Sequence, residues 1–221
     1  MDTIYECASK FASLKNFEYY FVVSHKRKAK SLLLNFQDSD FFHLAGFHYL
    51  SDINIPQNRH NTLKDILEKK KITDQLLNKS RFYSNPKPDR NIKSRIEHLD
   101  FLEEYLDNNN LIYIYNTQNN HYLQSFIKAD YLIESQLKNS KHIVYIFLKK
   151  RELSNFFCIV SFFKKDKVTY RGDKLYWMLK EKRTTNKTTV LFRHPNYTLE
   201  SLSTHLLPTS IPDNLCPKEE S

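Results

Sequence analysis

The chain reads HIVYIFLK at residues 142–149 and FFCIVSFF at residues 156–163, and these two stretches decide the predicted fold class. Both are rich in β-branched and aromatic residues, and a short polar segment separates them, which is typical of neighbouring strands joined by a turn. The same pattern recurs before and after this pair, so we predict a longer antiparallel series. The other strands predicted in the series are 111–116, 125–133, 176–184 and 188–194.

The residues before this series favour helices. Residues 3–16 and 62–79 carry apolar side chains at helical spacing. Ser94–Glu97 has the capping-box form that begins a helix, and the apolar stripe after it continues to Leu106. Two further strand candidates, joined by a basic turn, are 18–23 and 31–36.

Helices followed by a run of strands predict the organisation of the whole chain. We expect one α+β domain spanning residues 1–207. In it, N-terminal helices within residues 1–110 pack on a C-terminal antiparallel β-sheet formed by residues 111–194. Prolines recur from residue 208 onward, so residues 208–221 are predicted to form a flexible tail.

The cysteine content and hydropathy indicate the cellular compartment. Cys7, Cys158 and Cys216 lie far apart, and an odd number without a CxxC pair argues against a disulfide framework or a zinc knuckle. No stretch approaches the roughly 20 consecutive apolar residues that cross a bilayer. We therefore expect a cytoplasmic protein without a membrane partner.

Positive charge is concentrated in one part of the chain. The net charge is +9, and residues 141–193 alone hold 14 basic and 4 acidic side chains. A localised basic surface that also carries aromatic residues is typical of a protein that binds nucleic acid. The alternative is a solvated sheet edge on which lysines block pairing with other strands.

The sequence lacks the usual signatures of cofactor chemistry. It contains no phosphate-binding loop, dinucleotide turn, zinc-protease helix or nucleophile elbow, and its histidines are not at metal-ligand spacing. We therefore expect neither a metal nor another cofactor. RNA cleavage without a metal needs a base, an acid and fixed cations, which histidine, tyrosine, lysine and arginine can supply.

Candidates for these roles lie in and after the loop VTYRGDK at residues 168–174. Tyr170 and Arg171 precede Gly172, which would let the chain turn tightly beside a ligand, although the same residues also suit an ordinary turn. Strand alternation places Lys180 and Lys182 on one face. Their alternative is a solvated strand face, and Trp177 is either a core residue or a platform for a base.

The stretch FFHLAGFHYL at residues 41–50 holds one of only two glycines in the chain. We expect a helix here with Ser39 as its N-cap. Gly46 then either lets this helix approach the strand that bears Lys180 and Lys182, or relieves crowding among the neighbouring aromatic residues. His43 is correspondingly either a catalytic residue or a buried, hydrogen-bonded one.

Taken in order, HLAG at residues 43–46, the IVSFF strand and VTYRGDKLYWMLKEK resemble a phage-associated nuclease family over residues 30–184. It looks like a branch of the barnase, EndoU, colicin and RelE-like superfamily, with Ala45 where the family usually has threonine. The resemblance implies a barnase/EndoU/RelE-like fold and a nuclease of phage or mobile-element origin. The residues it singles out are His43, Gly46, Tyr170, Gly172, Lys180 and Lys182.

The leading hypothesis is a metal-independent, toxin-like endoribonuclease in the cytoplasm of a bacterial host cell. Its partners would be RNA or another nucleic acid, with an inhibitor or antitoxin as a further candidate partner. His43 and Tyr170 would transfer protons, and Lys180 and Lys182 would stabilise transition-state charge. The alternative is a non-catalytic module of the same fold that binds nucleic acid or a host protein. The remaining substrate contacts in the hypothesis are Arg95, Arg171 and Trp177.

Overall fold

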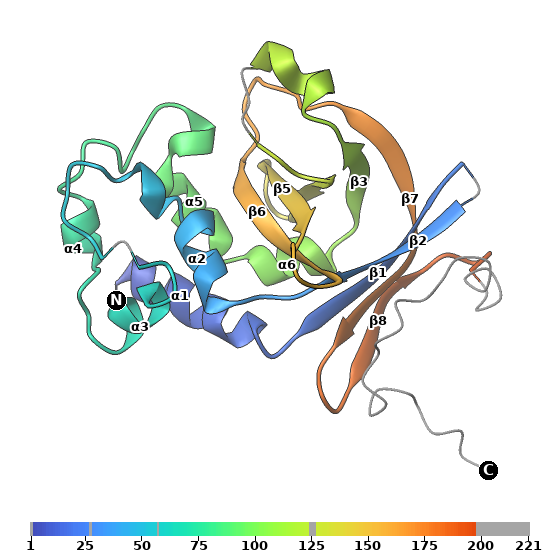
Figure 1. The fold of residues 1–221 in the computed structure, drawn as a ribbon, viewed down its shortest axis with the longest axis horizontal. Coiled ribbons are helices and arrows are strands. Elements are labelled where there is room, and N and C mark those ends of the chain that lie inside the picture. Colours follow the sequence, from blue (N-terminus) through green and yellow to red (C-terminus); the bar gives the residue numbers. More distant parts are fainter. Residues whose placement is uncertain (1, 27, 57, 124–126, 198–221) are drawn as a thin grey trace.

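The computed structural model describes residues 2–26, 28–56, 58–123 and 127–197, and its main feature is a closed β-barrel (Figure 1). Seven strands form the barrel in the order β1-β2-β6-β5-β4-β3-β7, and β7 pairs again with β1. The strands are β1 (Glu18–His25), β2 (Lys28–Leu34), β3 (Asn110–Tyr115), β4 (Tyr131–Gln136), β5 (Ile143–Lys150), β6 (Phe156–Lys164), β7 (Gly172–Arg183) and β8 (Thr188–Arg193).

The predicted open antiparallel sheet with helices packed on it is therefore wrong. β1 pairs along both of its edges, with β2 on one side and β7 on the other. β2 closes the ring through a short parallel pairing to β6, in which Leu33 lies opposite Phe156 and Leu34 opposite Phe157. Side-chain alternation predicts which face of a strand is buried but not which strands pair at its edges, so closure is not visible in the pattern.

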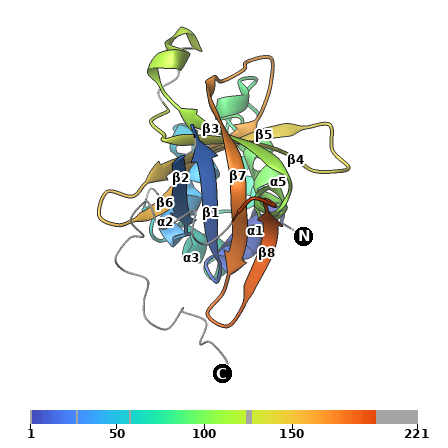
Figure 2. The ribbon, with the colours of Figure 1, turned by 90° about the vertical axis from the view of Figure 1, so that its right-hand side faces the viewer.

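β7 is the longest strand and joins three neighbours. Its first residues pair with β3, and its later residues pair with β8 on that same side and with β1 on the other. Figure 2 shows β7 beside β1, with β8 as an additional strand outside the seven-stranded ring. Most described strands lie within two residues of the predicted ranges, but β2 and β7 begin three and four residues earlier than predicted, at Lys28 and Gly172. β4 covers Tyr131–Gln136 where 125–133 was predicted, and residues 124–126 lie outside the described part.

The N-terminal helices pack on one side of the barrel, next to β6 (Figure 1). The helices described are α1 (Thr3–Leu14), α2 (Asp38–Leu44), α3 (Thr62–Leu67), α4 (Asp74–Leu77), α5 (Ile92–Leu99) and α6 (Leu102–Asp107). Short 3₁₀ turns are η1 (Phe47–Tyr49), η2 (Pro88–Arg90) and η3 (Gln118–Leu123). The buried side chains of α1, α2 and α5 form one apolar core with those of the barrel strands, which fixes the helices to the barrel.

Several predicted helix boundaries change. The helix predicted at 62–79 is split into α3 and α4, and the stripe from residue 94 to 106 is broken between α5 and α6. Asn91, and not Ser94, caps α5, because its side chain accepts a hydrogen bond from the Ser94 amide at 2.8 Å. Ser39 likewise lies inside α2, whose N-cap is Gln37. The tail predicted at 208–221 lies outside the described residues.

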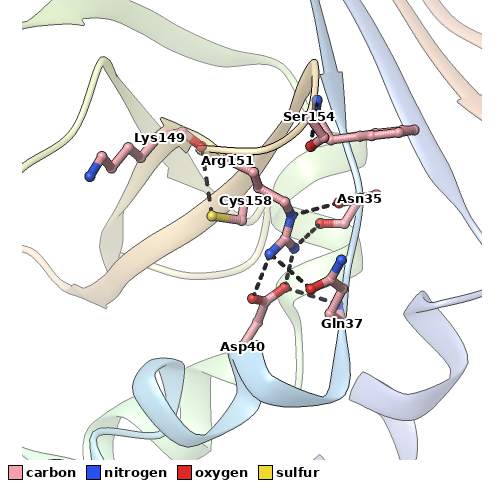
Figure 3. A network of polar contacts seen from close by, with 8 residues as sticks. Asn35, Gln37, Asp40, Lys149, Arg151, Ser154 and Cys158 are labelled. Carbon is pink, nitrogen blue, oxygen red and sulfur yellow. Dashed lines mark hydrogen bonds and ion pairs between the residues drawn. The ribbon is translucent and has the colours of Figure 1, made fainter. Parts of the chain in front are cut away.

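An arginine on the turn between β5 and β6 holds the start of α2 (Figure 3). The Arg151 guanidinium donates to the Asp40 carboxylate at 2.6 and 3.2 Å, to the Asn35 side chain at 3.0 Å and to the Gln37 side chain at 3.2 Å. Asp40 also accepts from the Gln37 amide, closing a capping box at the helix start. Because α2 contains His43 and ends two residues before Gly46, this network positions both residues relative to the barrel.

Candidate active site

A cavity of about 660 Å³ lies between the helical side of the molecule and strands β5 and β6. Its walls come from the end of α2 and η1, the segment at residues 86–90, α5, the two strands and the loop that leads to β7. Three of the sequence-predicted site residues line it, namely His43, Arg95 and Tyr170. Residues that lie far apart along the chain therefore converge on one space.

Gly46 ends α2 and makes room for Arg95. Its φ of +80° lies in the left-handed region, which glycine adopts without strain at a helix C-terminus. A Cβ atom at this position would lie 2.9 Å from Cδ and 3.3 Å from Nε of Arg95. The glycine thus allows close contact with α5. The expected approach to the strand bearing Lys180 and Lys182 does not occur.

Arg95 is buried at the cavity, with only 2% of its surface exposed. Its guanidinium donates to the backbone carbonyls of Leu44, at 3.2 Å, and of Asp89, and it lies between the rings of Tyr49 and Phe163 at 5.7 and 5.6 Å. Burial lowers the pKa of Arg95. Within the described ranges its Nε has no hydrogen-bond partner, and no carboxylate forms an ion pair with Arg95, although the nearby Asp89 charge opposes the lowering of its pKa.

A buried cation that forms no ion pair is energetically costly, and the charge of Asp89 offsets this cost only in part, so the site suits an anionic ligand. A guanidinium carries five N–H donors, and the two carbonyls use only two of them. The geometry therefore leaves donors for a phosphate group that enters the cavity.

Two histidines line the cavity beside this guanidinium. The rings of His43 and His48 lie 5.3 Å apart, and His48 packs on Tyr49 at 3.9 Å. Although both residues are exposed, partial burial lowers their pKa values, and Arg59 lowers that of His43 further. The pKa of His48 falls to about 4 through burial and the charges of Arg95 and His43. Both rings are neutral at pH 7 and can accept a proton.

Sequence reasoning did not select His48. The signal was present in FFHLAGFHYL, where the second histidine follows Gly46 by two positions. On a continuous helix, His43 and His48 would not lie one above the other, so the sequence alone gave no reason to place both rings at one cavity. The left-handed conformation of Gly46 brings them together.

Tyr170 belongs to a second aromatic cluster that forms the opposite wall. Tyr170 is half-buried, and its phenol lies close enough to Arg95 to raise the pKa of the guanidinium, against the effect of burial. This second cluster is distinct from the main core and is centred on β3, β4, β5 and β6. The rings around Tyr170, at 5.1–6.2 Å, are those of Tyr115, Tyr145, Phe147 and Phe163.

A β-bulge in β6 shapes the same wall. Phe147 pairs with Ser161 and Leu148 with Ile159, so Val160 is an extra residue in the ladder. As a result, two consecutive residues, Val160 and Ser161, both line the cavity, although strict alternation would send one of them to the other face.

Lys180 and Lys182 lie elsewhere and connect β7 to α6. Lys180 is 2% exposed, its ammonium donates to the carbonyls of Leu106 and Asn108 at 2.7 and 2.6 Å, and burial lowers its pKa to about 8. Lys182 forms ion pairs with Glu103 and, at 3.1 Å, with Asp107. Neither lysine is among the residues that line the cavity.

The remaining predicted residues divide between core and surface. Trp177 packs on Phe21 at 5.1 Å and donates from its indole to the Asn110 carbonyl at 2.8 Å, as a core residue does. Arg171 is exposed, and its backbone is bonded on both sides by the Asn120 side chain, at 2.7 and 2.8 Å.

Gly172 begins β7 where that strand crosses close to β3. A Cβ atom here would clash with the Ile114 carbonyl oxygen. Its φ lies outside the left-handed region, so the glycine serves close packing of two strands and not the expected tight turn. Within the described ranges, no group of three or more histidine, cysteine or acidic side chains is placed to hold a metal ion. In the same ranges no helix is long and apolar enough to cross a membrane.

Comparison with protein families identifies the chain. The model of the phage-Barnase-EndoU-ColicinE5/D-RelE like nuclease 4 family matches residues 3–195. The chain belongs to this family. The resemblance inferred from the sequence motifs is thus confirmed at family level, and membership of a nuclease-like family makes nucleic acid the substrate class. Searches of curated proteins and of solved structures found no match.

Proposed function

We propose that the chain is an endoribonuclease that cleaves RNA in this cavity without a metal ion, with the ribose 2′-hydroxyl as nucleophile. The observation that carries the proposal is the buried Arg95 guanidinium, which forms no ion pair among the described residues and lines one cavity with two neutral histidines and a tyrosine. A phosphate-binding cation, a proton acceptor and a proton donor in one space are the groups that this reaction needs.

His43 is proposed as the general base. Its lowered pKa keeps the ring neutral at pH 7, so that it can take the proton from the 2′-hydroxyl. The 2′-oxygen then forms a bond to phosphorus and the bond to the 5′-oxygen breaks. Tyr170 is proposed to give its phenolic proton to that 5′-oxygen. The products are a 2′,3′-cyclic phosphate and a 5′-hydroxyl. His48, at 5.3 Å from His43, orients it or replaces it as base.

Arg95 is proposed to hold the phosphate and to stabilise the charge that develops on the phosphorane. This role was predicted for Lys180 and Lys182, whose ammonium groups are instead bonded to α6. Arg171 is exposed next to Tyr170 and remains a proposed contact for a flanking phosphate. Trp177, which packs in the core, is not assigned a substrate contact.

The test is cleavage of labelled RNA in EDTA by four variants: His43→Ala, His48→Ala, Arg95→Leu and Tyr170→Phe. His25→Ala, at the far end of β1, is the matched control. We expect His43→Ala, Arg95→Leu and Tyr170→Phe to lower the rate by about 100-fold or more, and the control to keep wild-type activity.

Two results would contradict the proposal. Wild-type rates in folded His43→Ala and Arg95→Leu would remove the cavity as the active site. Tight RNA binding by a wild-type protein that cuts nothing would favour the non-catalytic binding module.

A further inference from the structure

We propose that the cavity admits one nucleotide that has left its stack, so that the substrate is single-stranded RNA and one base is held in the cavity. This inference rests on the proposed function and adds the form of the substrate and the place of its base. It is carried by the depth of Arg95, by the aromatic wall and by a hydroxyl group at the bulge of β6.

The depth of Arg95 decides which nucleic acid can reach it. Only 2% of this residue is exposed, and it lies at a cavity that also has Tyr49 and Tyr170 on its walls. In a duplex the bases stay stacked and the phosphates lie on the outside of a stiff helix, and such a helix is too wide to enter a cavity of about 660 Å³. A nucleotide turned out of its strand can carry its phosphate to the guanidinium.

The aromatic wall suits the base of that nucleotide. Tyr145, Phe163 and Tyr170 line the cavity from the second aromatic cluster, and Val160 extends the apolar surface. Unstacked bases bind on aromatic side chains because every base presents a π-face, and each such contact strengthens binding by about tenfold. The cavity volume also lies in the range of pockets that hold small molecules.

A hydroxyl group at the bulge is available for the edge of the base. Ser161 is 8% exposed and lines the cavity. Its hydroxyl can donate a hydrogen bond to the edge of a base or accept one from it. The bulge at Val160 gives both residues their place in the wall. The structure therefore pairs an apolar face with one polar contact, as a base requires.

The rim of the cavity carries the charge that flanking phosphates need. Besides Arg95, the cavity lining contains four basic and two acidic residues, and three of these four basic residues are exposed. Contacts of this kind bind the backbone of a single strand on either side of the turned-out nucleotide. The basic residues are Lys87, Arg90, Lys128 and Lys164, and the acidic residues are Asp89 and Asp166.

The test measures binding and cleavage separately. Calorimetry compares inorganic phosphate with the four nucleoside 3′-monophosphates on wild type, on Val160→Trp, which fills the base position, and on Ser161→Ala. Val190→Trp is the matched control, because it makes the same change on an exposed strand residue of β8. Val160→Phe replaces Val160→Trp if the tryptophan prevents folding. Cleavage of one RNA strand is measured alone and in a duplex.

We expect a nucleoside monophosphate to bind at least about tenfold more tightly than phosphate, and Val160→Trp, but not Val190→Trp, to abolish the difference. Ser161→Ala should reduce the preference among the four bases, and the single strand should be cut at least about 100-fold faster than the duplex. Equal cleavage of strand and duplex, with no effect of Val160→Trp, overturns this inference and leaves the nuclease intact. Nucleotide binding that depends on Val160 without any cleavage supports the base pocket and overturns the proposed function.

Discussion

Replacing Gly46 with alanine tests whether the left-handed bend after α2 exists to admit Arg95. The first cost is conformational, because a φ of +80° costs a residue with a Cβ about 1–2 kcal/mol. For a chain of this size, each kcal/mol lowers the melting temperature by about 2–4 °C, so we expect a decrease of about 2–8 °C. Differential scanning calorimetry measures this part.

The second cost falls on activity. The new Cβ would lie 2.9 Å from Arg95 Cδ, closer than real Cβ contacts, and the guanidinium is held by hydrogen bonds to the Leu44 and Asp89 carbonyls. The guanidinium must therefore move, and a displacement of about 1 Å at a catalytic group costs up to about 100-fold in rate. We expect RNA cleavage by folded Gly46→Ala to fall by about 10- to 100-fold.

A double-mutant cycle separates this mechanism from general damage. If Gly46→Ala acts by displacing Arg95, then adding it to Arg95→Leu causes little further loss of activity. Losses that multiply in the double variant would refute the reasoning, as would wild-type cleavage by a folded Gly46→Ala protein.

Three further predictions concern Lys180, Arg151 and His43. Lys180 has a pKa of about 8 in the folded state and 10.5 in the unfolded state, so the unfolded state binds more protons between these two pH values. The free energy of unfolding, measured in urea, should therefore rise by about 2–3 kcal/mol from pH 8 to pH 10.5. The Lys180→Met variant should not show this rise. Arg151→Met leaves the Asp40 carboxylate without its partner and should cost about 2–4 kcal/mol of stability, whereas Lys149→Met as control should cost less than about 0.5 kcal/mol. Because the base must be neutral and the His43 pKa lies below 6.5, cleavage should rise with pH to a half-maximum below pH 6.5, and a midpoint above that value would contradict its role.

The sequence predicted most strands well because they are rich in β-branched and aromatic residues and short polar segments separate them. The ranges 142–149 and 156–163 correspond to β5 and β6 within one residue at each end. The closed barrel was not predictable, since it depends on β1 pairing with a strand near the other end of the chain and on two residue pairs between β2 and β6. Nothing in the local pattern of either strand encodes these partners.

The candidate site shows the same division. His43, Arg95 and Tyr170 were selected for their chemistry, and the structure brings them to one cavity. Lys180 and Lys182 were selected by strand alternation, which correctly shows that they share a face but not that this face meets the last turn of α6. Their strand lies next to helix carbonyls and carboxylates that the sequence places more than seventy residues away.

The most direct measurement uses one RNA strand and a copy with a single 2′-deoxynucleotide at the cleaved position, both incubated with wild-type protein in EDTA. Mass spectrometry then identifies the product ends. Transfer through the 2′-hydroxyl predicts a 2′,3′-cyclic phosphate and a 5′-hydroxyl from the RNA, and no cut at the deoxy position. Cleavage of the deoxy strand at that position, or products with 5′-phosphate ends, would contradict the proposed chemistry of the cavity.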